Sequence, residues 1–325
     1  MDKPPLTAPT LARRRWDVID VARGVAILAM ILYHFGWDLS FLKLIETNVL
    51  AMPAWRWFAR AIAGSFLFLS GIGLVLAHGQ TIRWQPFWRR FGIVGGAALL
   101  VTAATWLAFP DSYIFFGILH CIALSSVLAL PFLRAPMSVT LAVAVLVLAG
   151  PLIFTAPALD APWLDWLGLG ALDPVANDYV PVFPWFAFVL LGTVFARLMM
   201  KDERPRLPAW QASGKLSRAV IWAGRHSLPI YLLHQIVLLG ALSGILQIVG
   251  PNPVAEARPF TAGCEASCGQ QGAAAATCQA LCSCIVENLR QDDSLWARVR
   301  ANDVDEAERL RVSRLTQQCL RQPPP

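Results

Sequence analysis

The sequence predicts an all-α protein: a polytopic membrane helical bundle of about seven transmembrane helices, followed by a small cysteine-rich helical C-terminal domain. Three observations lead to this class. Of the 325 residues, 56% are hydrophobic and only 15% are charged, whereas a soluble domain has about 25% charged residues. The apolar residues fall into long runs. Six of the seven cysteines follow Pro251.

The apolar runs predict the membrane spans, because crossing the hydrocarbon core takes about 20 predominantly apolar residues. The candidates are roughly Val18–Leu42, Trp57–His78, Phe91–Phe109, Ile114–Leu133, Met137–Phe154, Val180–Met200 and Leu228–Val249. The first run carries charges and lacks a small-residue cleavage site, so we interpret it as a retained signal anchor. Residues 1–250 are thus the predicted transmembrane domain, and residues 251–325 a separate tail.

Basic residues in the short loops predict the orientation, since cytoplasmic loops are enriched in Lys and Arg. The N-terminus and the even loops hold most of them: Lys3, Arg13, Arg14, Arg15, Arg83, Arg89, Arg90, Arg134, Lys201, Arg204, Arg206, Lys215, Arg218 and Arg225. We expect an integral plasma (inner) membrane protein with a cytoplasmic N-terminus and a periplasmic or extracellular tail. The formal charge of +6 fits this topology. Lipid is the expected partner, and no basic patch indicates nucleic acid.

The cysteines predict how the tail is held together. Cys264 and Cys268 lie four residues apart, as do Cys278 and Cys282, and this spacing puts both sulfurs on one helix face. Two antiparallel helices would allow the disulfides Cys264–Cys282 and Cys268–Cys278, with Cys284 and Cys319 as a third pair. Six cysteines allow 15 pairings, so spacing alone leaves the connectivity open. Zinc is the rival interpretation, but no histidine lies nearby.

The first span contains four ionisable residues: Asp20, Arg23, His34 and Asp38. At about 100° per residue they fall within roughly 80° of arc, so they share one helix face. Charges inside spans are costly and normally face the bundle interior, where they mark functional sites. Asp20 and Arg23 can form an i,i+3 pair at the cytoplasmic end. His34 lies roughly 16 Å further along the axis, and Asp38, one turn beyond, could orient its ring.

Other histidines extend this polar pattern. His120 lies about two turns into the fourth span, near the level of His34, whereas His234 lies in the cytoplasmic half of the seventh span. His120, like His34, could instead be a structural histidine bonded within the bundle. No H-E-x-x-H pattern is present, so we expect no metal.

Several segments, in order, resemble bacterial members of the heparan-alpha-glucosaminide N-acetyltransferase catalytic-domain family. They are "DVARGVAILAMILYHFGWDL", "FLFLSGIGLVLAHG", "RRFGIVGGAALLVTAATWLAFPDSYIFFGILHCIALSSVL", "VPVFPWFAFVLLGTVFA" and "GRHSLPIYLLHQ". The first segment is also similar to the integral-membrane O-acyltransferases of cell-surface sugars. The resemblance covers roughly residues 13–249, without the cysteine-rich tail.

This resemblance implies a membrane acyltransferase that moves an acetyl group from cytosolic acetyl-CoA to a sugar amine or hydroxyl on the extracytoplasmic side. An essential histidine is implied, and His34 is the best candidate; His120 remains the other. His34 would act as the base, or carry the acetyl group itself. Coenzyme A is anionic, so Arg23, Arg89 and Arg90, with Asp20 beside Arg23, are the expected donor-binding residues.

Two other classes remain open on the sequence alone. Buried charges also mark ion paths, so a proton-coupled transporter is one alternative. A non-enzymatic membrane protein that displays the cysteine-rich tail is the other. The sequence does not name the acceptor, decide between N- and O-acetylation, or give the oligomeric state, a homo-oligomer included.

Overall fold

The computed structural model describes residues 17–200 and 214–321, and the described residues contain helices and loops but no strand. The predicted all-α class is therefore confirmed. The α-helices are α1 (Asp17–Phe41), α2 (Pro53–His78), α3 (Trp84–Ala108), α4 (Ile118–Leu128), α5 (Met137–Ile153), α6 (Val182–Met199), α7 (Lys215–Arg225), α8 (Ser227–Val249), α9 (Pro253–Gln270), α10 (Ala275–Leu289), α11 (Asp293–Ala301) and α12 (Glu306–Arg321). Short 3-10 turns occupy Val49–Ala51, Pro131–Leu133, Pro157–Leu159 and Asp165–Leu167.

The described residues form two compact units. The first unit contains those up to Phe35 and those of Leu50–Leu239, and the second contains Gly36–Val49 and those from Gly240 onward. Helices α1 and α8 each begin in the first unit and end in the second.

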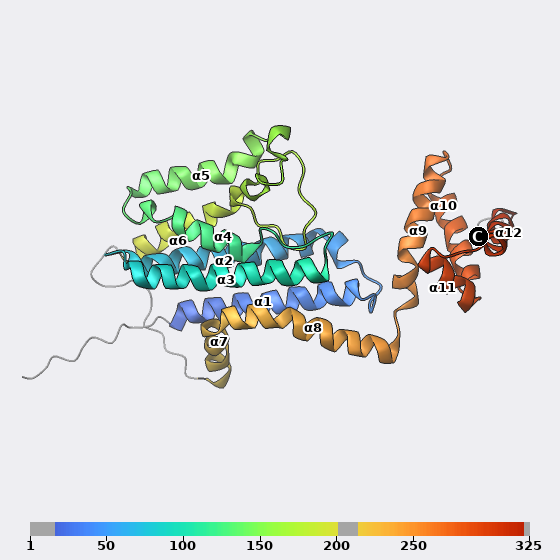
Figure 1. Cartoon of the computed structure of the whole chain (residues 1–325), viewed down its shortest axis with the longest axis horizontal. Helices are drawn as coiled ribbons and strands as arrows, with labels where there is room; N and C mark the ends of the chain where they lie inside the picture. Colours follow the sequence, from blue (N-terminus) through green and yellow to red (C-terminus); the bar gives the residue numbers. More distant parts are fainter. Residues whose placement is uncertain (1–16, 201–213, 322–325) are drawn as a thin grey trace, which may run out of the picture. The chain divides into compact units, whose positions relative to one another are not determined.

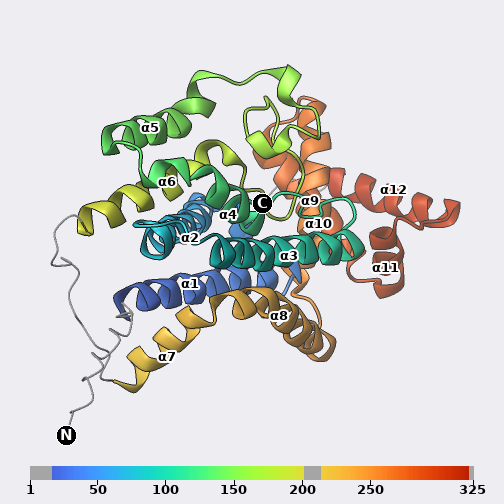
Figure 2. The same cartoon turned by 60° about the vertical axis from the view of Figure 1, so that its left-hand side comes forward.

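The first unit is a helical bundle built around α2 and α6. Helix α6 packs against both α2 and α5, and α4 packs against α2, α3 and α6. In both views of the chain, α1 lies between α3 and α8 (Figures 1 and 2). The α2–α6 contact depends on glycine, because a Cβ at Gly71 would collide with the Val189 carbonyl and one at Gly192 with that of Phe68. Small residues at such crossings let membrane helices approach closely.

The outer surface of this bundle is apolar. On α3, Leu99 is 68% exposed and Leu107 is 78% exposed, and on α8 Ile236 is 69% exposed. Exposing so much apolar surface to water would be unfavourable, whereas lipid tails solvate it. Five of the described helices, α1, α2, α3, α6 and α8, are long and apolar enough to cross a membrane. The chain is therefore an integral membrane protein.

The predicted number of seven spans is not confirmed. The fourth candidate, Ile114–Leu133, contains only the 11-residue helix α4 and a 3-10 turn. Eleven residues rise roughly 16 Å, about half of a hydrocarbon core of about 30 Å. The helix stops where Pro131, which has no N–H to donate, begins the turn. The fifth candidate forms the 17-residue helix α5.

The loop after α6 contains a helix that the span analysis did not predict. Helix α7 places Leu216 and Trp222 on its exposed surface and buries Ile221 and Ala223. Seven basic residues used to predict the orientation lie outside the described residues: Lys3, Arg13, Arg14, Arg15, Lys201, Arg204 and Arg206. The orientation stays a prediction.

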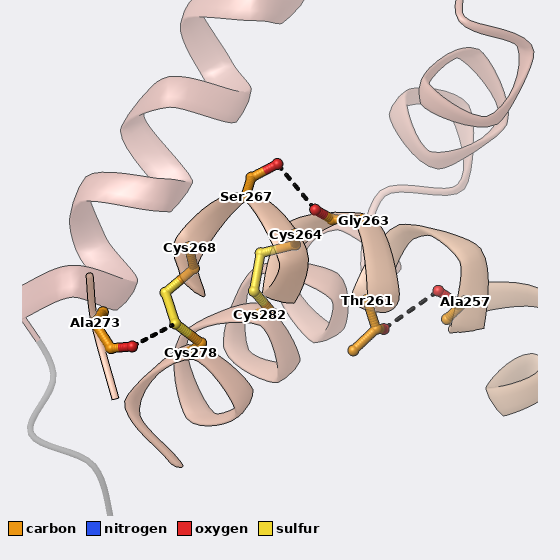
Figure 3. Close-up of a disulfide and its surroundings, with 9 residues drawn as sticks. All are labelled: Ala257, Thr261, Gly263, Cys264, Ser267, Cys268, Ala273, Cys278 and Cys282. Atoms are coloured by element: carbon orange, nitrogen blue, oxygen red, sulfur yellow. Dashed lines mark hydrogen bonds between the residues drawn. A yellow bond between two sulfur atoms is a disulfide. The ribbon is translucent and has the colours of Figure 1, made fainter. Parts of the chain in front are cut away.

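The second unit contains the cysteine-rich helices. Disulfides join Cys264 to Cys282 and Cys268 to Cys278, which staples α9 to α10 (Figure 3). A third disulfide, Cys284–Cys319, joins α10 to α12. The first two are the pairs that the four-residue spacing suggested, and the third joins the two cysteines expected to remain, so the disulfide interpretation is confirmed. Trp296, Phe260 and Val286 form part of a small core beneath the staples.

Maleimide labelling of the denatured protein tests this cysteine arrangement. We expect one reactive thiol per chain without reductant, because Cys121 is the free cysteine, and seven after reduction, the full cysteine count. Mass spectrometry counts the labels, and Cys121→Ser should remove the single label seen without reductant. Labelling of all cysteines without reductant would show that the tail is reduced in the cell.

Candidate functional site

A large cavity in the first unit is lined by cationic side chains. Its volume is ≈ 1400 Å³, and its walls come from α1, α2, α3, α4 and the junction of α7 with α8. The arginines in its lining are Arg23, Arg83, Arg89, Arg90 and Arg225. Asp20 is the sole acidic side chain in the described lining. The excess of positive charge gives this cavity the electrostatic character that suits an anionic ligand.

Glycine makes room for two of these guanidinium groups. Gly73 on α2 faces Arg23 of α1 and Arg90 of α3: a Cβ there would lie 3.1 Å from Arg23 Nη2 and 3.7 Å from Arg90 Nη1. The two guanidinium groups therefore converge on one backbone position from different helices. Like charges this close repel each other, and a bound anion between them would relieve that repulsion.

A close crossing of α1 and α7 brings a further arginine to the cavity. A Cβ at Gly224 would collide with the Asp20 carbonyl, and one at Gly24 with the Val220 carbonyl. This approach lets Arg225 Nε lie 2.9 Å from Asp20 Oδ2 and Arg225 Nη2 lie 3.1 Å from Asp17 Oδ1. The carboxyl groups raise the pKa of the solvent-exposed Arg225, chiefly through its hydrogen bond to Asp20.

The predicted i,i+3 pair on α1 is also present. Arg23 Nη1 lies 3.3 Å from Asp20 Oδ1. Asp20 therefore bridges Arg23 and Arg225 and holds the two side chains at the wall of the cavity. The four residues predicted to bind the donor, Asp20, Arg23, Arg89 and Arg90, all line this one cavity.

A pair of histidines lies in the same unit, next to a residue of the cavity wall. The ring centroids of His34 on α1 and His234 on α8 are 4.9 Å apart. His234 Nδ1 lies 2.6 Å from the carbonyl oxygen of Tyr231, and Tyr231 lines the cavity. His34 Nδ1 and His234 Nε2 are buried, and neither has a hydrogen-bond partner among the described residues.

The position of His234 differs from the level inferred from sequence. The span analysis placed His34 past the midplane and His234 in the cytoplasmic half, yet their rings are in contact. Counting residues along each predicted span therefore did not reveal that α1 and α8 bring these two rings together. His234 could be seen in the sequence, in the segment "YLLHQ". Nothing in the sequence indicated that the ring of His34 would lie beside it.

His120 is held differently from His34. Its Nδ1 accepts a hydrogen bond from the Gly117 N–H at 3.2 Å, and its Nε2 lies 3.1 Å from Thr102 Oγ1. With Nδ1 accepting, Nε2 carries the proton of the neutral ring and donates to Thr102. The Thr102 hydroxyl in turn donates to the Ile114 carbonyl at 2.7 Å. Both ring nitrogens are thus engaged, Nδ1 by the turn that begins α4 and Nε2 by Thr102 of α3, and no described ring contact joins His120 to His34.

Asp178 is a carboxylate that the sequence analysis did not single out as a site residue. Its Oδ2 accepts a hydrogen bond from the Ile118 N–H at 2.9 Å, at the first residue of α4. It lies close enough to Tyr33 and Tyr231 to act on both electrostatically. Burial raises the pKa of Asp178 to about 6, against the lowering effect of the Ile118 hydrogen bond.

The remaining predicted residue is Asp38. It is completely buried on α1, one turn beyond His34. Its burial agrees with the expectation that the polar face of this helix points inward. Its predicted role in orienting His34 stays a prediction.

Comparison with known proteins identifies one family. The family model described as "Heparan-alpha-glucosaminide N-acetyltransferase, catalytic" matches residues 15–236. The matched stretch includes the arginine-lined cavity and both histidines of the pair, and it ends before the cysteine-rich tail. No curated protein and no solved structure matches the chain.

Replacing Gly73 tests whether the cavity binds anions through the converging guanidinium groups. In Gly73→Val, the added methyl groups should displace Arg23 and Arg90, and we expect pyrophosphate binding to weaken about 10-fold, as loss of charge-assisted contacts would cause. The matched control is Gly92→Val on α3, because a Cβ at Gly92 meets nothing within 4 Å. Calorimetry on the detergent-solubilised protein measures the affinities. Equal affinity in both variants would contradict this assignment.

The raised pKa of Asp178 predicts a pH-dependent stability. The folded protein holds this proton more tightly than the unfolded chain, so the resulting stabilisation is largest at low pH and is lost as the pH rises through about 6. Asp178→Asn keeps a hydrogen-bond acceptor for Ile118 but does not titrate. We expect the Tm of the parent to fall relative to that of the variant between about pH 4.5 and about pH 7.5. A Tm difference that stays constant over this range would disprove the assignment.

Proposed function

The chain belongs to the heparan-alpha-glucosaminide N-acetyltransferase catalytic family, an acetyltransferase family, and from this premise we propose the reaction of this protein. It transfers the acetyl group of cytosolic acetyl-CoA to an amine or hydroxyl group of a sugar on the extracytoplasmic side of the membrane. The observation that carries the proposal is the ≈ 1400 Å³ cavity with its arginine lining. It gives a large anionic donor a place inside a membrane bundle.

The cavity matches coenzyme A in both of its chemical parts. Arg23, Arg89 and Arg90 offer planar guanidinium groups that suit the phosphate oxygens, and Asp20 keeps Arg23 in place through their ion pair. Apolar side chains from α2 and α4, among them Phe66 and Ile122, also line the cavity. These would accommodate the uncharged arm that carries the thioester.

His34 is the proposed catalytic base. Acetyl transfer forms a bond between the thioester carbonyl carbon and the acceptor O or N, and it breaks the C–S bond. The acceptor loses a proton to His34, and the departing thiolate of coenzyme A finally takes that proton up. A neutral imidazole suits this task at about pH 7. His34 has a buried ring nitrogen without a partner among the described residues, whereas both nitrogens of His120 are engaged. This difference favours His34 over His120.

The proposed membrane orientation puts the donor cavity and the acceptor on opposite sides of the membrane. We place the N-terminus and the arginine cavity on the cytoplasmic side of the inner membrane, where acetyl-CoA is made, and the tail outside. The disulfides of the tail support this orientation, because such bonds persist in oxidising compartments. The sugar acceptor would approach from the outer side, and Asp38, beyond His34 on α1, would orient the base.

Acetyl transfer in reconstituted vesicles tests the proposal. Labelled acetyl-CoA is placed outside the vesicles and amino sugars and their hydroxyl analogues inside, or the reverse. We expect the parent protein to transfer the label. In His34→Ala the transfer rate should fall about 100-fold or more, which is the contribution typical of a general base. His120→Asn should retain more activity than His34→Ala. Binding of coenzyme A, measured separately, should survive in both variants because neither residue lines the cavity.

Three results would count against this function. Full transfer activity in His34→Ala would remove His34 from the mechanism. Proton-coupled uptake of a solute without binding of acetyl-CoA would favour the transporter. The non-enzymatic display function would be favoured if the protein binds no coenzyme A and if its cellular role is lost only when residues 251–325 are deleted.

A further inference from the structure

The contact between His34 and His234 brings two histidine rings from different helices together. The ring planes make an angle of 59°, and the centroids lie 4.9 Å apart. By contrast, His226 lies 2.9 Å from the Trp222 carbonyl and stacks on the Trp222 ring, all within one segment. The His34–His234 contact joins α1 to α8.

The hydrogen bond to Tyr231 determines which nitrogen of His234 can accept. A carbonyl oxygen only accepts hydrogen bonds, so the 2.6 Å contact requires a proton on His234 Nδ1. In the neutral ring, Nε2 then has a free lone pair. That nitrogen is buried and has no hydrogen-bond partner among the described residues. Leaving a buried acceptor unpaired costs free energy, and a neighbouring N–H donor would recover it.

We propose that His234 is the positioning residue for His34: its Nε2 accepts the N–H of His34 when substrate binds, and this fixes the tautomer of the base. The other nitrogen of His34 then presents its lone pair to the acceptor. This inference rests on the proposed acetyl transfer and adds a second residue to it. His234 takes the role that a carboxylate has in catalytic triads, and a neutral imidazole performs it without adding a charge to the bundle.

The proton balance of the reaction agrees with this arrangement. His34 receives the acceptor proton and becomes an imidazolium with an N–H on each nitrogen. His234 Nε2 accepts one of these N–H groups and stabilises the positive charge as it forms. When the thiolate of coenzyme A takes up the proton, His34 returns to the neutral tautomer that it had at the start. His234 itself gains and loses no proton over the cycle.

Tyr231 connects this pair to the donor cavity. Its side chain belongs to the cavity lining, and its carbonyl holds His234 Nδ1. No N–H···N bond joins the two rings in the described structure, since His34 Nδ1 and His234 Nε2 both lack a hydrogen-bond partner there. Catalytic hydrogen bonds are commonly long in the absence of substrate and tighten in the complex. A donor that contacts Tyr231 is well placed to shift His234 toward His34.

The test is a double-mutant cycle on the full-length protein in vesicles. We expect His234→Ala to lower kcat about 100-fold with little change in the KM for acetyl-CoA. The variant His34→Ala/His234→Ala should be no slower than His34→Ala alone, because His234 acts through His34. In the control pair His120→Asn/His234→Ala, the two effects should multiply. If His234→Ala does not fold, His234→Asn replaces it, since its amide can still donate to Tyr231 and accept from His34, and it should recover part of the lost kcat.

The outcomes separate this inference from the proposed function. Suppose that the parent transfers acetyl groups but His234→Ala keeps kcat within about twofold, or that the losses in kcat of His34→Ala and His234→Ala multiply. Then His234 is not the positioning residue, while the proposed transferase activity stands. A parent that transfers no acetyl group overturns both. The inference is supported if the double variant loses no more kcat than His34→Ala alone and if the KM for acetyl-CoA is unchanged.

Discussion

The architecture depends on keeping several guanidinium groups together inside a bundle whose outer surface is apolar. Arginine side chains cannot face lipid tails without a large penalty, so Arg23, Arg89 and Arg90 must converge on water or on a ligand. Glycines make this convergence possible: Gly73 leaves space beside Arg23 and Arg90, and Gly224 lets Arg225 reach Asp20. One carboxylate, Asp20, binds two of these arginines and leaves the cavity with an excess of positive charge.

The polar groups of the bundle are ordered along a path that suits group transfer. The arginine cavity is the proposed binding compartment, Tyr231 belongs to its wall, and the carbonyl of Tyr231 binds His234 of the histidine pair. Asp178 acts electrostatically on Tyr231 as well and binds the first turn of α4. A thioester placed at the inner end of the cavity would lie next to these groups. In the proposed reaction the bundle would thus combine anion binding and base chemistry with few buried charges.

Much of this could be predicted from the sequence, because the signals are local. Apolar runs predicted the long helices, four-residue cysteine spacing predicted the staples Cys264–Cys282 and Cys268–Cys278, and periodicity predicted the inward polar face of α1. The contacts that were missed are non-local. Arg225 meets Asp17 across 208 positions of sequence, and the His34–His234 contact joins α1 to α8. Neither has a spacing rule, since both depend on how helices cross. The early end of α4 at Leu128, before the 3-10 turn at Pro131, was missed because the segment is as apolar as a span.

The measurement that tests the account most directly is an experimental structure of the protein with coenzyme A bound in a lipid nanodisc. The account predicts phosphate density in contact with Arg23 and Arg90, and the thiol end of the ligand at Tyr231 and next to the histidine pair. An empty arginine cavity at saturating coenzyme A, or ligand bound elsewhere with its thiol far from His34, would contradict it.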